Sequence, residues 1–181
     1  MAKTISCMLN KNLTKELACN YSLNQVVDIY LAEFAQASQA SAITMANGEY
    51  SVSAISEDLS WAHIEPQKDS ASYADTLVVG GNGAKYRNHS LTFSFAKVYD
   101  EDMAKAIDAL SLGKYVALLK VTSGEYIMLG RLTGLEATVA ESVAEAAADG
   151  NQGLNVTMEG NTVESAVAVP KAVGDAIKLL S

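Results

Sequence analysis

Short runs of β-branched and aromatic residues recur along the 181-residue sequence, separated by small clusters of Gly, Asn, Ser and Asp. Such runs favour strands, because branched and aromatic side chains fit a pleated sheet. Strands joined by connections this short pair as antiparallel neighbours. The pattern predicts a mainly β fold, an antiparallel sandwich or barrel of about eight to ten strands. The predicted strands cover residues 26–34, 41–55 (a hairpin), 59–65, 72–79, 89–97, 114–121, 126–139, 154–160 and 162–169.

Turn residues predict where the chain reverses. The Asn-Gly pair at 47–48 favours a type I′ hairpin turn, because both central residues need φ > 0. The Ser-Gly pair at 123–124 predicts the turn of a central, almost continuously apolar hairpin. A final hairpin is expected around residues 160–161. Gly130 and Gly134 lie inside a predicted strand and indicate bulges or bends.

The strand at residues 89–97 alternates cleanly between apolar and small polar side chains. Leu91, Phe93 and Phe95 share one face, while Thr92 and Ser94 share the other. We therefore expect one face of this strand to be buried and the other to meet water or a partner.

One internal helix is expected in "DEDMAKAIDALSLG", because Met103, Ile107 and Leu110 recur at helical spacing. Asp100 is the predicted N-cap and Gly113 occupies the position that follows a helix end. Residues 140–153 have a helical composition that breaks at Asp149, Gly150 and Gly153, and they predict either a short helix or a mobile acidic loop.

The chain divides into an amino-terminal arm (1–25), a β-domain (26–169) and a carboxy-terminal helical tail (170–181). Pro170 suits a helix start. The tail carries an apolar stripe that packs either on its own sheet or on a neighbour, and we take it as an inter-subunit contact. The stripe consists of Val173, Ile177 and Leu180.

The sequence "VVGGNGAKYRNHS" raises the question of a phosphate site. The spacing does not fit a P-loop, and the segment that follows is a strand, so no helix N-terminus meets the loop. A dinucleotide fingerprint is excluded for the same reason, and Lys85 occupies the acid position of a calcium-binding GGxGxD repeat. We expect a flexible loop between two strands, and contact of this loop with another subunit is what the family resemblance given below implies. Its predicted contact residues are Gly80, Gly81, Asn82, Gly83, Lys85, Tyr86 and Arg87.

No set of residues predicts catalysis or a metal centre. His63 and His89 are the only histidines, no GxSxG motif is present, and both fit a sheet or surface role. Cys7 and Cys19 form no CxxC pair; whether they form a disulfide stays open. Acids at 100–102 fit a helix start, and the sequence at 149–153 lacks most of an EF-hand loop. We expect no enzyme activity, cofactor or metal.

Charge and hydropathy limit the partners. The net charge of −8 argues against a protein that grips nucleic acid, but it suits a surface past which DNA must move freely. No run of about 18 apolar residues is present, and the first residues lack a signal-peptide pattern, so we expect no membrane span and synthesis in the cytoplasm.

Several segments together resemble small tail-tube-type virion proteins of tailed bacteriophages, especially the group in gut bacteroidete phages and prophages. The segments are "LACNYSLNQVVDIYLAEF", "YRNHSLTFSF", "LGKYVALLKVTSGEYIMLGRLTGLEA", "DGNQGLNVTMEG" and "SAVAV". The resemblance implies a tail-tube β-sandwich or barrel with a flanking helix. It also implies a homo-oligomeric, hexameric ring that stacks with further rings, contacts other tail proteins and lets genomic DNA pass in the virion tail.

Three other classes stay open. A carboxy-terminal helix is not required of a minimal tube protein, which leaves a terminator, collar or head–tail connector. A capsid decoration protein shares the β-rich composition. A small β-barrel module that binds a carbohydrate or peptide is expected to be a monomer with exposed aromatic residues.

Overall fold

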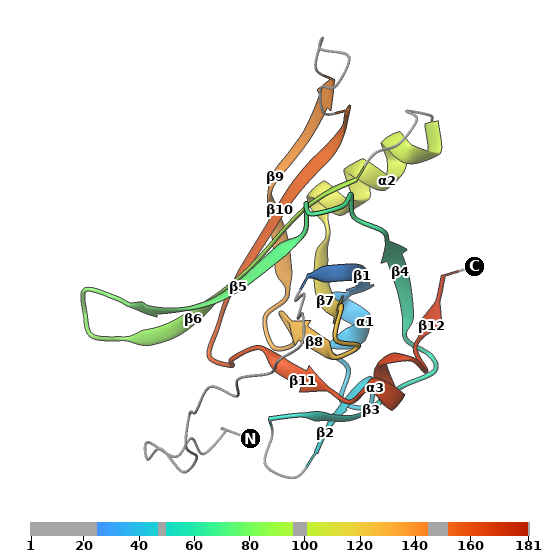
Figure 1. The fold of residues 1–181 in the computed structure, drawn as a ribbon. Helices are drawn as coiled ribbons and strands as arrows, with labels where there is room; N and C mark the ends of the chain where they lie inside the picture. The colour runs from blue at the N-terminus through green and yellow to red at the C-terminus, as the bar shows by residue number, and fades with distance from the viewer. Residues whose placement is uncertain (1–24, 47–49, 96–100, 145–151, 181) are drawn as a thin grey trace, which may run out of the picture.

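The computed structural model describes residues 25–46, 50–95, 101–144 and 152–180 (Figure 1). Strands hold 55% of these residues and helices 14%, so the mainly β prediction is confirmed. The strands are β1 (Val26–Glu33), β2 (Ile43–Met45), β3 (Val52–Ile55), β4 (Ser60–Ile64), β5 (Ser72–Val79), β6 (Lys85–Phe95), β7 (Lys114–Val121), β8 (Tyr126–Leu129), β9 (Leu135–Ala144), β10 (Gln152–Thr162), β11 (Val167–Val169) and β12 (Lys178–Leu179). The helices are α1 (Phe34–Ala37), α2 (Glu101–Leu112) and α3 (Lys171–Gly174).

Ten of these strands form one large sheet. Its order is β12-β4-β1-β7-β9-β10-β6-β5, and β8 pairs with both β7 and β11. All its pairings are antiparallel except that of β12 with β4. The β2–β3 hairpin is a separate two-stranded sheet. Two hairpins, β5–β6 and β9–β10, extend well beyond the rest of the molecule in different directions (Figure 1).

The paired strands β1 and β7 lie at the centre of the fold, since side chains on both of their faces are buried. This explains their almost continuous apolar sequences. Core cluster 1 covers one face and contains Tyr30, Ala32, Ala37, Ala42, Ile43, Val52, Leu59, Trp61, Val116, Leu118, Tyr126, Met128, Val167 and Val169. Core cluster 2 covers the other and contains Ile29, Leu31, Leu91, Phe93, Leu110, Ala117, Leu119, Leu129, Leu135, Leu154, Val156 and Met158.

Most of the predicted elements are confirmed. Strand β5 has the predicted bounds, and the hairpins β2–β3 and β7–β8 form as expected, although the turn at 47–48 lies outside the described residues. Helix α2 is present, with Leu110 buried and Ile107 half-buried against core cluster 2. Asp100 and the side chain of Met103 lie outside the described parts, as does the arm over 1–24.

The interpretation of residues 126–139 as one strand was wrong. The backbone turns sharply between β8 and β9, where Gly130 and Gly134 have φ of 71° and 73° and the Gly134 amide donates to the Gly130 carbonyl at 2.7 Å. Only glycine adopts this left-handed region without cost. The two glycines therefore divide the segment into separate strands instead of bending one.

The expected final hairpin at residues 160–161 is also wrong. Strand β10 passes through this pair without turning and aligns with β6 as far as Thr162, while β11 pairs with β8. Gly160 is needed for a close approach, since a Cβ there would lie 2.2 Å from the Gly134 carbonyl oxygen. The alternative of a helix within residues 140–153 fails over its described part, because β9 continues to Ala144 beside β10.

The predicted helical tail over residues 170–181 is not shown. Helix α3 is a single turn, and β12 follows it and pairs with β4. Gly174 is buried against the ring of Tyr126, which a Cβ would approach to 2.5 Å. The segment is thus shaped by its contacts with the sheet, and these override its helical spacing.

Candidate functional site

The tip of the β5–β6 hairpin carries the glycine-rich segment. Gly83 has a φ of 81°, its amide donates to the Gly80 carbonyl at 2.8 Å, and the Asn82 side chain accepts from the Ala84 amide at 3.1 Å. The glycines and the asparagine therefore close a tight turn between two strands. The loop between strands that the sequence predicted is confirmed.

The outer half of this hairpin has little covering it. Leu77 and Val79 are 55% and 59% exposed, and Tyr73 is 38% exposed nearer the body. Register pairs Leu77 with Arg87 and Val79 with Lys85, so these four side chains share a face. A projecting hairpin with apolar and basic residues on one face suits contact with another macromolecule.

The predicted contact residues of the loop occupy different environments. Gly81, Gly83 and Lys85 are exposed, whereas Gly80, Tyr86 and Arg87 are half-buried and Asn82 is used in the turn. Arg87 donates from Nε to Asp75 Oδ1 and from Nη2 to the Asp75 carbonyl at 3.0 Å. Lys85 is therefore the available charge at the tip, while Arg87 binds within its own subunit. Whether these residues contact another subunit stays a prediction.

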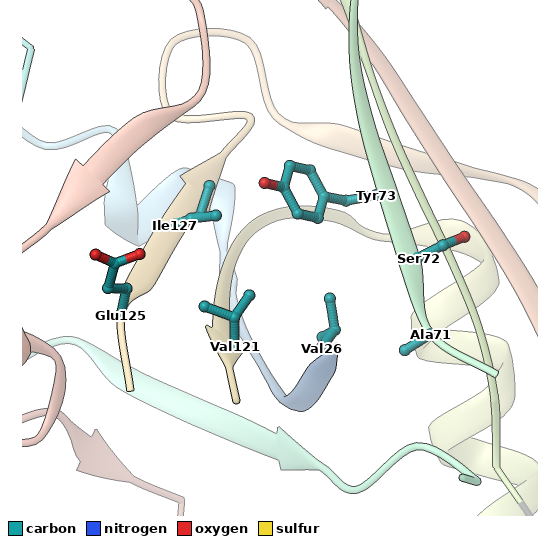
Figure 2. Close-up of a pocket in the computed structure, with 7 residues that line it drawn as sticks. All are labelled: Val26, Ala71, Ser72, Tyr73, Val121, Glu125 and Ile127. Atoms are coloured by element: carbon teal, nitrogen blue, oxygen red, sulfur yellow. The ribbon is translucent and has the colours of Figure 1, made fainter. Parts of the chain in front are cut away.

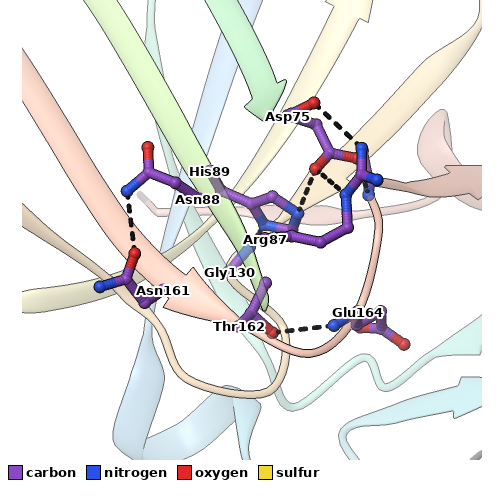
Figure 3. Close-up of polar contacts among 9 residues, drawn as sticks. Asp75, Arg87, Asn88, His89, Gly130, Asn161, Thr162 and Glu164 are labelled. Carbon is purple, nitrogen blue, oxygen red and sulfur yellow. Dashed lines mark hydrogen bonds and ion pairs between the residues drawn. The ribbon is translucent and has the colours of Figure 1, made fainter. Parts of the chain in front are cut away.

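A buried polar cluster forms the base of the hairpin (Figure 3). His89 is 2% exposed, accepts from the Gly130 amide through Nδ1 at 3.1 Å, and places Nε2 3.5 Å from Asp75 Oδ1. Asp75 Oδ2 also accepts from the Ala166 amide at 2.9 Å. Because the Gly130 amide donates to Nδ1, the neutral ring carries its proton on Nε2, toward Asp75.

A second ion pair lies beside this cluster. Arg131 holds the buried Glu164 through two bonds, Nε to Oε2 at 2.9 Å and Nη2 to Oε1 at 2.7 Å. The Glu164 amide donates to the Thr162 hydroxyl at 3.3 Å. Bidentate pairing of this kind fixes geometry as well as charge. Together the two pairs fasten the turn after β8, the end of β10 and the hairpin base to one another.

The electrostatics of the cluster favour an ionised aspartate and a neutral histidine. Burial opposes ionisation of Asp75, but its bonds with Arg87 and Ala166 and its proximity to His89 outweigh this and hold the Asp75 pKa below its ordinary value. Burial lowers the pKa of His89, and the charges of Asp75 and Glu164 offset only part of that effect. The role that suits this cluster is structural: it stabilises the packing of the hairpin base against the body.

The sheet formed by β5, β6, β10 and β9 turns a polar face away from core cluster 2. Three cross-strand bonds between side chains line it: Asn88 to Asn161 at 3.1 Å, Thr92 to Thr157 at 3.2 Å and Ser94 to Asn155 at 2.5 Å. We call this the polar face. It consists of Ser72, Ala74, Thr76, Val78, Tyr86, Asn88, Ser90, Thr92, Ser94, Glu136, Val139, Glu141, Asn155, Thr157, Glu159 and Asn161.

The polar face is acidic. Its ionisable acids are Glu136, Glu141 and Glu159, and none of the residues that define it is Lys or Arg. Lys114 reaches its edge from β7 and is paired with Glu136 at 2.8 Å. The prediction that one face of strand β6 is buried and the other is polar is confirmed, since Leu91 and Phe93 are fully buried while Thr92 is exposed.

A small pocket lies where β5 leaves the body (Figure 2). Its volume is about 320 Å³, and its wall includes Val26, Tyr73, Glu125 and Ile127. The Tyr73 side chain points from β5 toward Ile127, and Glu125 lies on the far side of the pocket (Figure 2). Its lining combines the Glu125 carboxylate and the hydroxyl-bearing residues Ser72 and Tyr73 with apolar side chains.

The predicted contacts of the carboxy-terminal segment separate into two kinds. Val173 and Ile177 are half-buried and pack against core cluster 1, and the Tyr126 hydroxyl donates to Asp175 at 2.7 Å. Leu180 is 62% exposed at the edge of a groove beside α2. The structure thus assigns the first two side chains to the core of their own subunit.

Two further observations concern the described residues only. They contain no group of three or more His, Cys, Asp or Glu side chains placed to hold a metal ion. Nor do they contain a helix with the length and apolar content needed to cross a membrane.

His63 stacks on Tyr30 with ring centroids 4.8 Å apart and bonds to Asp28 at 3.0 Å, which uses both the face and the Nε2 atom of its ring.

No family model, curated protein or solved structure matches the chain. Within the described residues, the β5–β6 hairpin and the polar face are the features that bear most directly on function. Sequence alternation indicated the polar face at Thr92 and Ser94, but not its continuation over β9. The buried cluster was missed, because the pairing of His89 with Asp75 depends on the register between two strands.

Proposed function

We propose that this chain is a structural virion protein of a tailed bacteriophage, which self-assembles into the stacked rings of a tail tube. Genomic DNA passes through the rings without specific binding. The partners are further copies of the chain in a hexameric ring, copies in adjacent rings, and other tail proteins. The protein works in the virion tail after synthesis in the host cytoplasm, and it catalyses no reaction.

The polar face is the observation that carries this proposal. A channel for DNA needs a wall that holds water and offers no fixed cations to the phosphates. Small hydroxyl and amide side chains bonded in pairs across the strands supply such a wall, and Glu141 and Glu159 repel the DNA backbone. The mainly β architecture and the resemblance of the sequence segments support the same assignment.

The β5–β6 hairpin supplies a contact between rings in this proposal. It projects beyond the body, and its tip carries Lys85 beside the exposed Leu77 and Val79 (Figure 1). The apolar pair would become buried on an adjacent ring, while Lys85 would meet the acidic surface of a subunit whose net charge is −8. The cluster around Asp75 keeps the base of the hairpin rigid.

Two measurements on the purified full chain test the proposal. Light scattering and negative-stain images should show rings or tubes, whereas a stable monomer at high concentration would favour a small binding module. Images of particles that carry the protein at the head or collar would instead support a connector or decoration protein.

A pair of matched variants tests the role of the polar face. Glu141→Lys with Glu159→Lys places cations on the face, so assembled rings should retain duplex DNA at low salt and release it as salt rises. The control, Glu57→Lys with Asp58→Lys, makes the same change of charge in the exposed turn before β4. Equal DNA retention by both variants would contradict the proposed channel wall.

A further inference from the structure

An apolar groove runs between helix α2 and strand β4. Its volume is about 690 Å³, and Ile64, Phe95, Ile107 and Tyr115 line it. These four side chains are half-buried and pack against core cluster 2, so the groove is a part of the core surface that the described residues leave uncovered. An apolar surface of this kind marks a binding site more often than a solvated face.

The surroundings of the groove are acidic. Glu65 lines it, Glu33 lies opposite Tyr115 in the register of β1 and β7, and Asp102 lies one turn before Ala106 on α2. None of the described residues that line the groove is Lys or Arg. Lys105 on α2 already pairs with Glu101 and Asp102. An occupant with apolar side chains and positive charge suits this groove.

Residues 1–24 have that composition. They contain three lysines and one glutamate, a net charge of +2, whereas residues 25–181 contain ten basic and twenty acidic residues, a net charge of −10. They also contain large apolar residues at short intervals, namely Ile5, Met8, Leu9, Leu13, Leu17 and Leu23. At roughly 3.3 Å per residue, an extended segment of this length reaches about 80 Å, enough to span from one subunit to the next.

We propose that residues 1–24 of a neighbouring copy occupy the α2–β4 groove. The inference rests on the proposed assembly into rings and names the surface that receives the arm. Two bodies of net charge −10 repel each other, and a basic segment laid between them offsets that repulsion. When a copy receives its segment from one neighbour and gives its own to the other, the contact is heterologous, and it forms a ring when the rotation between copies closes.

The chain is well suited to a disulfide test, because Cys7 and Cys19 are its only cysteines and both lie in the segment. Ala106 and Ala109 are exposed on α2 and line the groove, so a cysteine at either position removes no core contact. Ala106→Cys is the main variant, and Ala109→Cys replaces it if the first does not fold. The control is Ala54→Cys, which is exposed on β3, away from α2 (Figure 1).

The full-length variants are oxidised with copper phenanthroline and resolved by non-reducing electrophoresis and mass spectrometry. We expect Ala106→Cys to form an interchain disulfide to Cys7 or Cys19 about 100-fold faster than the control, because docking raises the local thiol concentration. Changing Cys7 and Cys19 to Ser should abolish the product. A disulfide within one chain, or a rate equal to the control, would overturn the inference.

Light scattering on the same samples separates this inference from the proposed function. Rings that form without the interchain disulfide overturn only the placement of the arm and leave the ring proposal standing. A sample that stays monomeric at all concentrations overturns both. Rings whose interchain disulfide joins Cys7 or Cys19 to the groove cysteine support both.

Discussion

Removal of the Asp75 carboxylate should loosen the β5–β6 hairpin from the body. In Asp75→Ala the Ala166 amide loses its acceptor, which costs about 1 kcal/mol, and half-buried Arg87 loses its ion pair, about 1 kcal/mol after allowance for solvent. His89 also loses the carboxylate that faces Nε2. We expect the free energy of unfolding to fall by about 2 kcal/mol.

Urea unfolding followed by circular dichroism measures this loss. With a slope of about 2 kcal/mol per molar urea, the midpoint should move down by roughly 1 M. Thr76→Ala is the matched control, because Thr76 is the next residue on β5 and its exposed side chain lies on the opposite face. A midpoint for Asp75→Ala within about 0.2 M of this control would refute the reasoning that Asp75 fastens the hairpin.

Three further predictions follow from particular contacts. Burial lowers the pKa of His89 below 6.5, so the unfolded chain binds the proton more readily and the free energy of unfolding should fall as the pH drops below about 6.5. In His89→Gln, denaturation curves should show a smaller change of stability with pH, and an unchanged pH dependence would contradict the prediction. Gly160→Ala places a Cβ against the Gly134 carbonyl and should lower the free energy of unfolding by about 2 kcal/mol. A wild-type midpoint in urea unfolding would show instead that β10 can move aside. Replacing residues 79–85 with Asn-Gly shortens the β5–β6 hairpin and keeps the pairing of the remaining residues. The melting temperature should stay within about 4 °C of the wild-type value, while tubes no longer form. Tubes of normal length would exclude the tip as a stacking contact.

Local sequence patterns were sufficient for most strands and for helix α2. Alternation at Leu91 and Phe93 indicated a buried face, and the apolar run of β7 indicated a central strand, because burial on one or two faces leaves a direct trace in the sequence. The helix was readable for the same reason, since Ile107 and Leu110 repeat at helical spacing on one face.

Three of the errors in the fold arise at glycines. Gly130 and Gly134 provide left-handed backbone at a turn, Gly160 allows a strand to pass close to that turn, and Gly174 fits beneath the ring of Tyr126. A sequence shows that side chains are absent at these positions, but only the packed structure shows whether conformation or close approach requires it. The sequence predicted that residues 162–169 pair with β10, whereas β11 pairs with β8, and this pairing depends on the same long-range packing.

Much less of the candidate site could be predicted. The glycine-rich turn was located, but Arg87 was interpreted as an outward contact, whereas it binds Asp75 twelve residues earlier across the hairpin. The polar face needed the registers of three strand pairs, and the His89 cluster needed a turn more than forty residues away in sequence, at Gly130. Such contacts are set by topology, which a single sequence encodes only indirectly.

A cryo-electron microscopy reconstruction of the assembled full chain is the most direct measurement of the proposed role. We expect stacked rings in which the polar face of β5, β6, β10 and β9 lines the central channel and the β5–β6 hairpin reaches an adjacent ring. Discrete monomers, or rings in which the polar face points outward and another surface lines the channel, would contradict the proposal.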